Sequence, residues 1–193
     1  PGQKKLVSDV YRTIMRQKLL FMQAPTGVGK TISTIFPAVK AVGEELADRI
    51  FYLTAKTITA TVAKETFALL EKKGYRAKTI QITAKEKLCP CDEMECNPVT
   101  CPYAKGHFDR VNDAVFDLLH RCEMIERDDI LSQADRYTVC PFELCLDTAS
   151  WCDNIICDYN HVFDPNVYLK RFFQEGIKGD YIFLIDEAHN MVE

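Results

Sequence analysis

The feature that most constrains this sequence is a glycine-containing loop, Ala24–Thr31 (APTGVGKT), between an apolar run and a helical segment. The run Leu19–Met22 predicts a short buried strand, and Thr31–Leu46 predicts a helix. A strand, a loop of this kind and a helix in this order are typical of a phosphate-binding loop, in which backbone N–H groups and the helix N-terminus surround a phosphate. The alternative is a glycine-rich turn that binds nothing, and the order of the elements argues against it.

The loop predicts a role for each of its last residues. Lys30 is placed to contact the β- and γ-phosphates of a nucleotide, and the Thr31 hydroxyl is placed to bind Mg²⁺. Ala24 stands where the strict pattern has glycine, so the two glycines that follow supply the backbone freedom. The residues whose backbone is expected to contact the phosphates are Thr26, Gly27, Val28 and Gly29.

A second motif follows the apolar run Tyr181–Ile185, which predicts another buried strand. The sequence DEAH therefore begins at the carboxyl end of a strand, where open α/β sheets bind their ligands. Asp186 is expected to complete the Mg²⁺ site, and Glu187 is expected to orient and deprotonate the attacking water. A charged strand end alone would mean little, but the two motifs together predict hydrolysis of a nucleoside triphosphate.

Strands and helices alternate along the chain on both sides of its middle part. Such alternation predicts an α/β fold with a parallel sheet covered by helices. The expected helices are Gln3–Arg16 and Thr57–Lys73, the latter ending before Gly74, and the other expected strands are Arg49–Thr54, Ala77–Thr83 and Asn154–Tyr159.

The middle of the chain differs from the rest in cysteine content and in charge. All nine cysteines lie between Cys89 and Cys157, and eight of them fall within residues 84–152. This segment carries a net charge of −7, whereas the remainder carries +3. We expect one helix there, Ala104–Ile125, and no strand. The sequence therefore predicts an inserted, mostly helical domain at 84–152, within an α/β domain formed by 1–83 and 153–193.

Cysteines at this density suggest metal or cluster binding, because the chain begins without the apolar stretch of an export signal. No apolar run approaches the roughly 20 residues that span a bilayer, so no membrane association is expected. Zinc is the main competitor, but no C-x₂-C pair occurs in the sequence. Disulfides and unligated buried cysteines are the remaining alternatives. The cysteines expected to be buried or spare thiols are Cys122, Cys145, Cys152 and Cys157.

With both motifs on one chain, the sequence resembles the superfamily 2 helicases, and in particular the iron–sulfur helicases of the XPD/DinG family. The resemblance runs over nearly the whole chain but matches only the first part of such a helicase. It implies a RecA-like motor domain, ATP as the nucleotide, contact of Gln3 with the nucleotide, and a [4Fe–4S] cluster in the insertion. The segments that carry the resemblance, besides the two motifs, are Pro1–Gln3, Phe51–Thr57, Lys87–Cys89, Thr100–Tyr103, Val139–Phe142 and Asp158–Pro165.

Within this resemblance, the cluster ligands that fit best are Cys89, Cys96, Cys101 and Cys140, because the family's ligands have wide and uneven spacing. A proline follows three of these four cysteines and stiffens the turn that presents the thiolate. Cys91 is an alternative to Cys89 or to Cys96, since Cys89-Pro90-Cys91 offers two thiols close together.

The resemblance also implies ATP-driven 5′→3′ translocation on single-stranded DNA, with unwinding of duplex or forked DNA, in DNA repair or a related process. The net charge of −4 gives no overall indication of nucleic-acid binding, so any DNA contacts must be local. Lys56 and Thr57, which follow the expected strand Arg49–Thr54, are the expected contacts. His189 is expected to connect the phosphate site with the second motor domain of the full-length chain. Weaker candidates for DNA contact are Lys85, Lys87, Lys105 and Arg110.

Two other functions fit part of the sequence. A P-loop ATPase switch with a structural zinc module, and without unwinding activity, would use the same nucleotide site. A DNA-binding module without turnover is less compatible, because Lys30, Asp186 and Glu187 are all present. We expect the chain to be a fragment that does not unwind DNA by itself, from a cytoplasmic protein, or a nuclear one if the source is eukaryotic.

Overall fold

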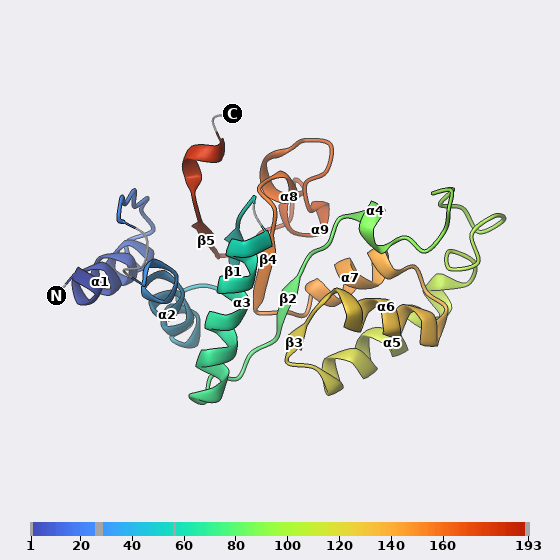
Figure 1. Cartoon of the computed structure of the whole chain (residues 1–193), viewed down its shortest axis with the longest axis horizontal. Helices are drawn as coiled ribbons and strands as arrows, with labels where there is room; N and C mark the ends of the chain where they lie inside the picture. Colours follow the sequence, from blue (N-terminus) through green and yellow to red (C-terminus); the bar gives the residue numbers. More distant parts are fainter. Residues whose placement is uncertain (1, 26–28, 56, 192–193) are drawn as a thin grey trace. The chain divides into compact units, whose positions relative to one another are not determined.

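The computed structural model describes residues 2–25, 29–55 and 57–191. The chain divides into two compact units, residues 1–76 with 156–193 and residues 77–155 (Figure 1). The strand order of the sheet is β3-β2-β4-β1-β5, and the β1–β5 and β2–β3 pairs are parallel. The predicted α/β class with a parallel sheet is therefore confirmed.

In the first unit, two parallel strands end at the same edge. β1 (Arg49–Leu53) is buried from Ile50 onward and pairs in register with β5 (Tyr181–Ile185), so that Leu53 lies beside Ile185. The pairing continues one residue further, because the Asp186 N–H donates to the Leu53 carbonyl oxygen at 3.0 Å. The residues that follow β1 and β5 therefore emerge side by side.

Helices of the first unit cover these strands. α2 packs against β1, β5, α1 and α3, and α3 ends before Gly74, whose φ of 102° allows the left-handed turn predicted there. Short α9 adds Phe172 and Phe173 to an aromatic cluster around Phe51 of β1. The helices of this unit are α1 (Gly2–Met15), α2 (Lys30–Gly43), α3 (Thr57–Lys72), α8 (Asn160–Phe163), α9 (Lys170–Phe173) and the 3₁₀ turn Ala188–Met191.

The prediction of a buried strand at Leu19–Met22 is wrong. These four residues lie outside any helix or strand, and Leu19 and Phe21 are 86% and 88% exposed. The chain leaves α1 through Gln17, which has a φ of 53°, and then joins no strand ladder. An apolar run forms a buried strand only where a neighbouring strand supplies hydrogen-bond partners, and the run itself does not encode that neighbour.

The second unit is mostly helical but differs from the expected organisation in two ways. The expectation of no strand in residues 84–152 is wrong, because β3 (Met124–Ile125) pairs in parallel with β2 (Thr79–Gln81). The expected single helix is shorter than predicted, so Cys122 follows it instead of lying on its apolar face, and three further helices were missed. The helices of this unit are α4 (Lys85–Leu88), α5 (His107–Arg121), α6 (Arg127–Tyr137) and α7 (Pro141–Ala149).

The remaining strand, β4 (Asn154–Cys157), is buried throughout and spans the point where the chain passes from the second unit to the first. Before it, α7 ends in a turn at Trp151, the only tryptophan of the sequence, whose side chain is 70% exposed. None of the helices in the described residues combines the length and the apolar character that crossing a membrane requires.

Candidate nucleotide site and cysteine cluster

The phosphate-binding loop leads directly into α2. Gly29 precedes the helix in the left-handed conformation, with a φ of 74°, and a Cβ atom at this position would overlap the Gln3 amide. The left-handed backbone favours glycine here, and its missing side chain leaves room for the Gln3 amide, the group expected to contact the nucleotide. No side chain caps α2 at Gly29, so the first N–H groups of the helix are available to an anion. Thr26, Gly27 and Val28 lie outside the described residues.

Three of the predicted active-site side chains come together at the start of α2 and the end of β5. The Lys30 ammonium lies 3.7 Å from Oε1 of Glu187, and Nδ1 of His189 lies 3.5 Å from the other carboxylate oxygen of Glu187. The Lys30 and Glu187 side chains are 28% and 33% exposed, so both can be reached by a ligand. The two motifs, far apart in the sequence, thus meet in one site.

A buried tyrosine connects the two predicted Mg²⁺ ligands. The Tyr52 hydroxyl makes hydrogen bonds with the side chains of Thr31 and Asp186, and Tyr52 is only 3% exposed. Burial raises the pKa of Tyr52 well above its usual range, and the Asp186 carboxylate acts in the same direction. Tyr52 therefore stays protonated and can donate its hydrogen bond to Asp186. The sequence does not distinguish Tyr52 from its neighbours, because four consecutive residues of β1 are buried. Only the pairing register of β1 determines that Tyr52 is the one near Asp186.

A second tyrosine holds the backbone of the DEAH turn. The Tyr159 hydroxyl donates to the Asp186 carbonyl oxygen and lies 3.2 Å from that of Glu187. The same Glu187 carbonyl accepts hydrogen bonds from the backbone and the side chain of Asn190, at 2.9 and 3.0 Å. Glu187 has a φ of 51°, a conformation that is uncommon for a residue with a side chain. These hydrogen bonds fix that turn and thus the direction of the Glu187 carboxylate.

The predicted DNA contacts stay predictions. Lys56 lies outside the described residues, and for Thr57 only the backbone, which begins α3, is described.

The predicted cluster ligands lie around one cavity in the second unit. Cys89, Cys96, Cys101 and Cys140 line it, and Cys91 does so as well. Lys85, which also lines the cavity, hydrogen-bonds Cys96, and this bond together with the nearby Cys140 raises the pKa of the Lys85 ammonium. Five thiols that span more than fifty residues of sequence thus meet at one place.

Cys91 belongs to this cavity as closely as the four favoured cysteines. Its thiol hydrogen-bonds those of Cys101 and Cys89, and burial together with these neighbours raises its pKa to about 11. The alternatives in which Cys91 replaces Cys89 or Cys96 as a ligand therefore stay open.

The remaining cysteines lie elsewhere. Cys145, Cys152 and Cys157 are buried among apolar residues, and burial raises the pKa of Cys145 to about 12. Cys122 is half-buried after α5. Thiols in such surroundings stay protonated and fill space as small apolar groups.

The arrangement of the cysteines bears on which metal group they could bind. Among the described residues, no three histidine, cysteine, aspartate or glutamate side chains converge on a point that could hold a single metal ion. A structural zinc ion needs four ligands around one atom, whereas a [4Fe–4S] cluster takes thiolates on its several irons. Five thiols around one cavity supply donors that suit either group.

Comparison with known proteins gives consistent results. The family model described as DEAD_2 matches residues 58–193. The general transcription and DNA repair factor IIH helicase subunit XPD/RAD3 of Saccharomyces cerevisiae is 23% identical, over 99% of this chain and 28% of the yeast protein. A protein described as a probable ATP-dependent helicase, from Methanocaldococcus jannaschii, is 24% identical, over 98% of this chain and 28% of the relative. The chain thus spans about a quarter of the length of these relatives.

Two solved structures share the fold. A truncated XPD superposes with a TM-score of 0.63 at 18% identity, covering 97% of this chain and 52% of that one. An XPD helicase superposes with a TM-score of 0.60 at 17% identity, covering 98% of this chain and 32% of that one. At these identities the likeness concerns the fold.

Proposed function

The chain belongs to the DEAD_2 family, and we propose that it is the nucleotide-binding part of an ATP-dependent DNA helicase with a [4Fe–4S] cluster in its second unit. The observation that supports this most is the meeting of Lys30 and Glu187 at 3.7 Å, beside a tyrosine that joins Thr31 to Asp186. Helicase names of the curated relatives agree with the proposal.

The positions of these side chains suggest how ATP would be hydrolysed. A γ-phosphate entering at the start of α2 competes with Glu187 for the Lys30 ammonium. Once Lys30 contacts the phosphate, Glu187 is free to orient a water molecule and accept its proton. Mg²⁺, held by Thr31 and Asp186, would neutralise charge that develops on the phosphate oxygens. Tyr52 keeps these two ligands together, and Tyr159 keeps the turn behind them in place.

The cysteine-lined cavity supports the second part of the proposal. Four of Cys89, Cys91, Cys96, Cys101 and Cys140 would bind a [4Fe–4S] cluster, which would brace loops that have no helix or strand of their own. In the full-length protein we propose 5′→3′ translocation on single-stranded or forked DNA, with a role in DNA repair. Lys56 and Thr57 would contact the strand, and His189 would communicate with a second motor domain.

Two measurements on the full-length protein test this function. Anaerobically purified protein is expected to absorb broadly at roughly 400 nm and to contain iron and sulfide in proportion. It is also expected to displace a strand from a duplex with a 5′ single-stranded tail when ATP is added. Stoichiometric zinc without sulfide, together with hydrolysis but no displacement, would instead support an ATPase switch with a zinc module.

A further inference from the structure

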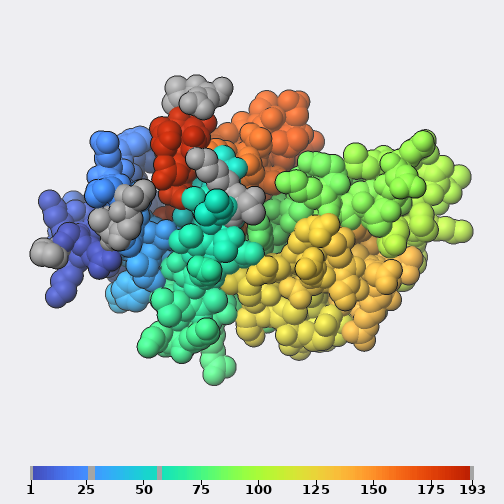
Figure 2. Space-filling view, in the orientation of Figure 1, coloured from blue at the N-terminus to red at the C-terminus, as the bar shows by residue number. Residues whose placement is uncertain are grey.

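The segments that carry the cysteines of the cavity contain almost no regular structure. Residues 89–106 form loops without helix or strand, and Cys140 lies in the turn between α6 and α7 (Figure 1). In the space-filling view, the green loop residues lie against the yellow and orange helices of the same unit (Figure 2). Main-chain ladders do not fix these loops, so other contacts must position the thiols.

One arginine joins two of these segments. The Arg110 guanidinium, from the first turn of α5, donates to the carbonyl oxygens of Tyr137 at 2.9 Å and Thr138 at 2.6 Å. It also donates to the carbonyl oxygen of Lys105 at 2.7 Å. Lys105 follows Cys101 by four residues, and Thr138 precedes Cys140 by two. A single planar group thus links the backbone beside one cysteine to the backbone beside another.

Two further side chains form hydrogen bonds with the backbone at or near cysteines of the cavity. Arg127, the first residue of α6, donates to the Lys87 carbonyl oxygen at 3.2 and 3.0 Å, two residues before Cys89. His107, the first residue of α5, accepts a hydrogen bond at Nδ1 from the backbone N–H of Cys140 itself, at 3.2 Å. His107 is only 4% exposed, and its other ring nitrogen lies 3.8 Å from the Asp147 carboxylate.

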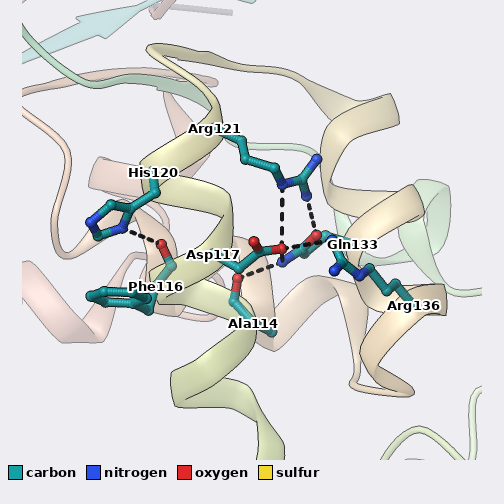
Figure 3. A network of polar contacts seen from close by, with 7 residues as sticks. All are labelled: Ala114, Phe116, Asp117, His120, Arg121, Gln133 and Arg136. Carbon is teal, nitrogen blue, oxygen red and sulfur yellow. Dashed lines mark hydrogen bonds and ion pairs between the residues drawn. The ribbon is translucent and has the colours of Figure 1, made fainter.

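The helices that present these groups are themselves held together. Gln133 of α6 is fully buried and donates to the Ala114 carbonyl oxygen of α5 at 2.8 Å and to the Asp117 carboxylate at 2.9 Å (Figure 3). Arg121 and Arg136 also contact that carboxylate, from α5 and α6 respectively. Arg110 and Arg127 therefore extend from one connected pair of helices.

We propose that Arg110, together with His107 and Arg127, is a positioning residue that holds the cysteine segments in place for the cluster before the cluster binds. This inference rests on the proposed function, because the three residues are assigned to position the ligands of the cluster proposed there. Guanidinium hydrogen bonds to carbonyl oxygens limit the freedom of the loops, so less order has to be imposed when the iron is bound. Groups that orient metal ligands in this way commonly change metal retention by about 10- to 100-fold when they are removed.

The test measures the rate at which iron is lost to a chelator, with the absorption spectrum and far-UV circular dichroism recorded on the same samples of the full chain. Arg110→Ala is expected to lose iron about 10-fold faster than wild type, and Arg110→Lys to lie between them, because an ammonium cannot reach three carbonyl oxygens at once. Arg127→Ala, which affects one carbonyl oxygen, is expected to lose iron roughly threefold faster. Arg12→Ala is the control for the loss of an arginine, because Arg12 is an exposed residue of α1 in the first unit.

His107 provides the second variant pair. His107→Ala is expected to release iron faster, and His107→Asn is expected to restore the rate, since its Oδ1 can accept the same N–H of Cys140. If Arg110→Ala keeps its dichroism and releases iron at the wild-type rate, the inference is overturned. If Arg110→Ala instead loses its helical circular dichroism, the His107 variants decide the matter. Equal rates of iron release from His107→Ala and His107→Asn then overturn the inference. Wild-type protein without iron and sulfide would instead contradict the cluster of the proposed function.

Discussion

In the first unit Lys30 begins a helix and Asp186 directly follows a strand, whereas in the second unit the five thiols of the cavity lie on loops and turns. The nucleotide site is therefore placed by main-chain hydrogen bonds: the register of β1 and β5 brings Asp186 beside the strand that carries Tyr52. The cysteine site is placed by side chains, above all Arg110, that reach backbone carbonyl oxygens across the loops.

This difference indicates how each site responds to change. A site at the ends of regular elements keeps its geometry when one reactive side chain is replaced, so a substitution there should remove chemistry and leave the fold. A site on tethered loops draws stability from its ligand, so a substitution there should affect the ligand and the local structure together. The following predictions test this contrast.

The largest effect is expected for Lys30→Ala in the full-length protein. Removing the ammonium from the γ-phosphate should lower kcat for ATP hydrolysis by about 10³-fold or more, with unchanged circular dichroism. Lys40→Ala is the matched control, because Lys40 lies on the same helix and pairs with Glu44 on the surface. Hydrolysis within a few-fold of wild type would contradict the assignment of the phosphate loop.

In the second unit, Cys140→Ser is expected to lose most of the bound iron and to melt at a lower temperature, because the lost ligand also removes folding energy. Cys157→Ala replaces a buried cysteine of β4, away from the cavity, and should retain its iron. Iron and sulfide analysis with a thermal melt gives the answer. Full iron content in Cys140→Ser would show that the ligand set is wrong.

A smaller effect in the first unit is expected for Tyr159→Phe. Loss of the hydroxyl frees the carbonyl oxygens of Asp186 and Glu187, and should lower kcat by roughly 10-fold with little change in KM for ATP. Tyr11→Phe, which removes a hydroxyl bonded to Glu44, should leave both constants unchanged. An equal effect of the two substitutions would mean that Tyr159 does not direct the turn.

The smallest effect concerns pH and the helix pair of the second unit. The hydrogen bond from Gln133, with the charges of Arg121 and Arg136, holds the pKa of Asp117 below its usual range. A lowered pKa in the folded state stabilises the fold above the pKa of the unfolded chain, about 4, and this contribution disappears as the pH falls through the folded value. Melting temperatures between about pH 5 and pH 3 should therefore fall more steeply for wild type than for Asp117→Asn. If the melting temperatures of the two proteins fall equally with pH, Asp117 does not contribute to the pH dependence of stability.

The residues that meet at the candidate nucleotide site could be named from the sequence, but the tyrosines that contact them could not. Lys30 and Asp186 are fixed by short motifs at the ends of elements, which local sequence encodes. Tyr52 and Tyr159 act through the pairing of strands and through a turn, so their roles depend on contacts between segments more than twenty residues apart. The same limit applies at Leu19–Met22, because an apolar run does not encode the neighbouring strand that it would need to form a sheet.

In the second unit, signals for the missed helices were present. Glu126 and Asp129 form reciprocal hydrogen bonds at the start of α6, and Pro141 occupies the first turn of α7, a favoured position for proline. The contacts of Arg110 could not be predicted from the sequence, because no sequence pattern distinguishes an arginine that binds carbonyl oxygens from one exposed on the surface.

The position of Trp151 makes the second unit the only source of indole emission in the chain. Excitation of tryptophan therefore reports on the surroundings of one residue of the second unit. An iron–sulfur chromophore in the same unit would absorb light in the range where indole emits, so loading of the cluster should quench the fluorescence. A fluorimeter could thus follow the filling of the cysteine site of this chain in real time.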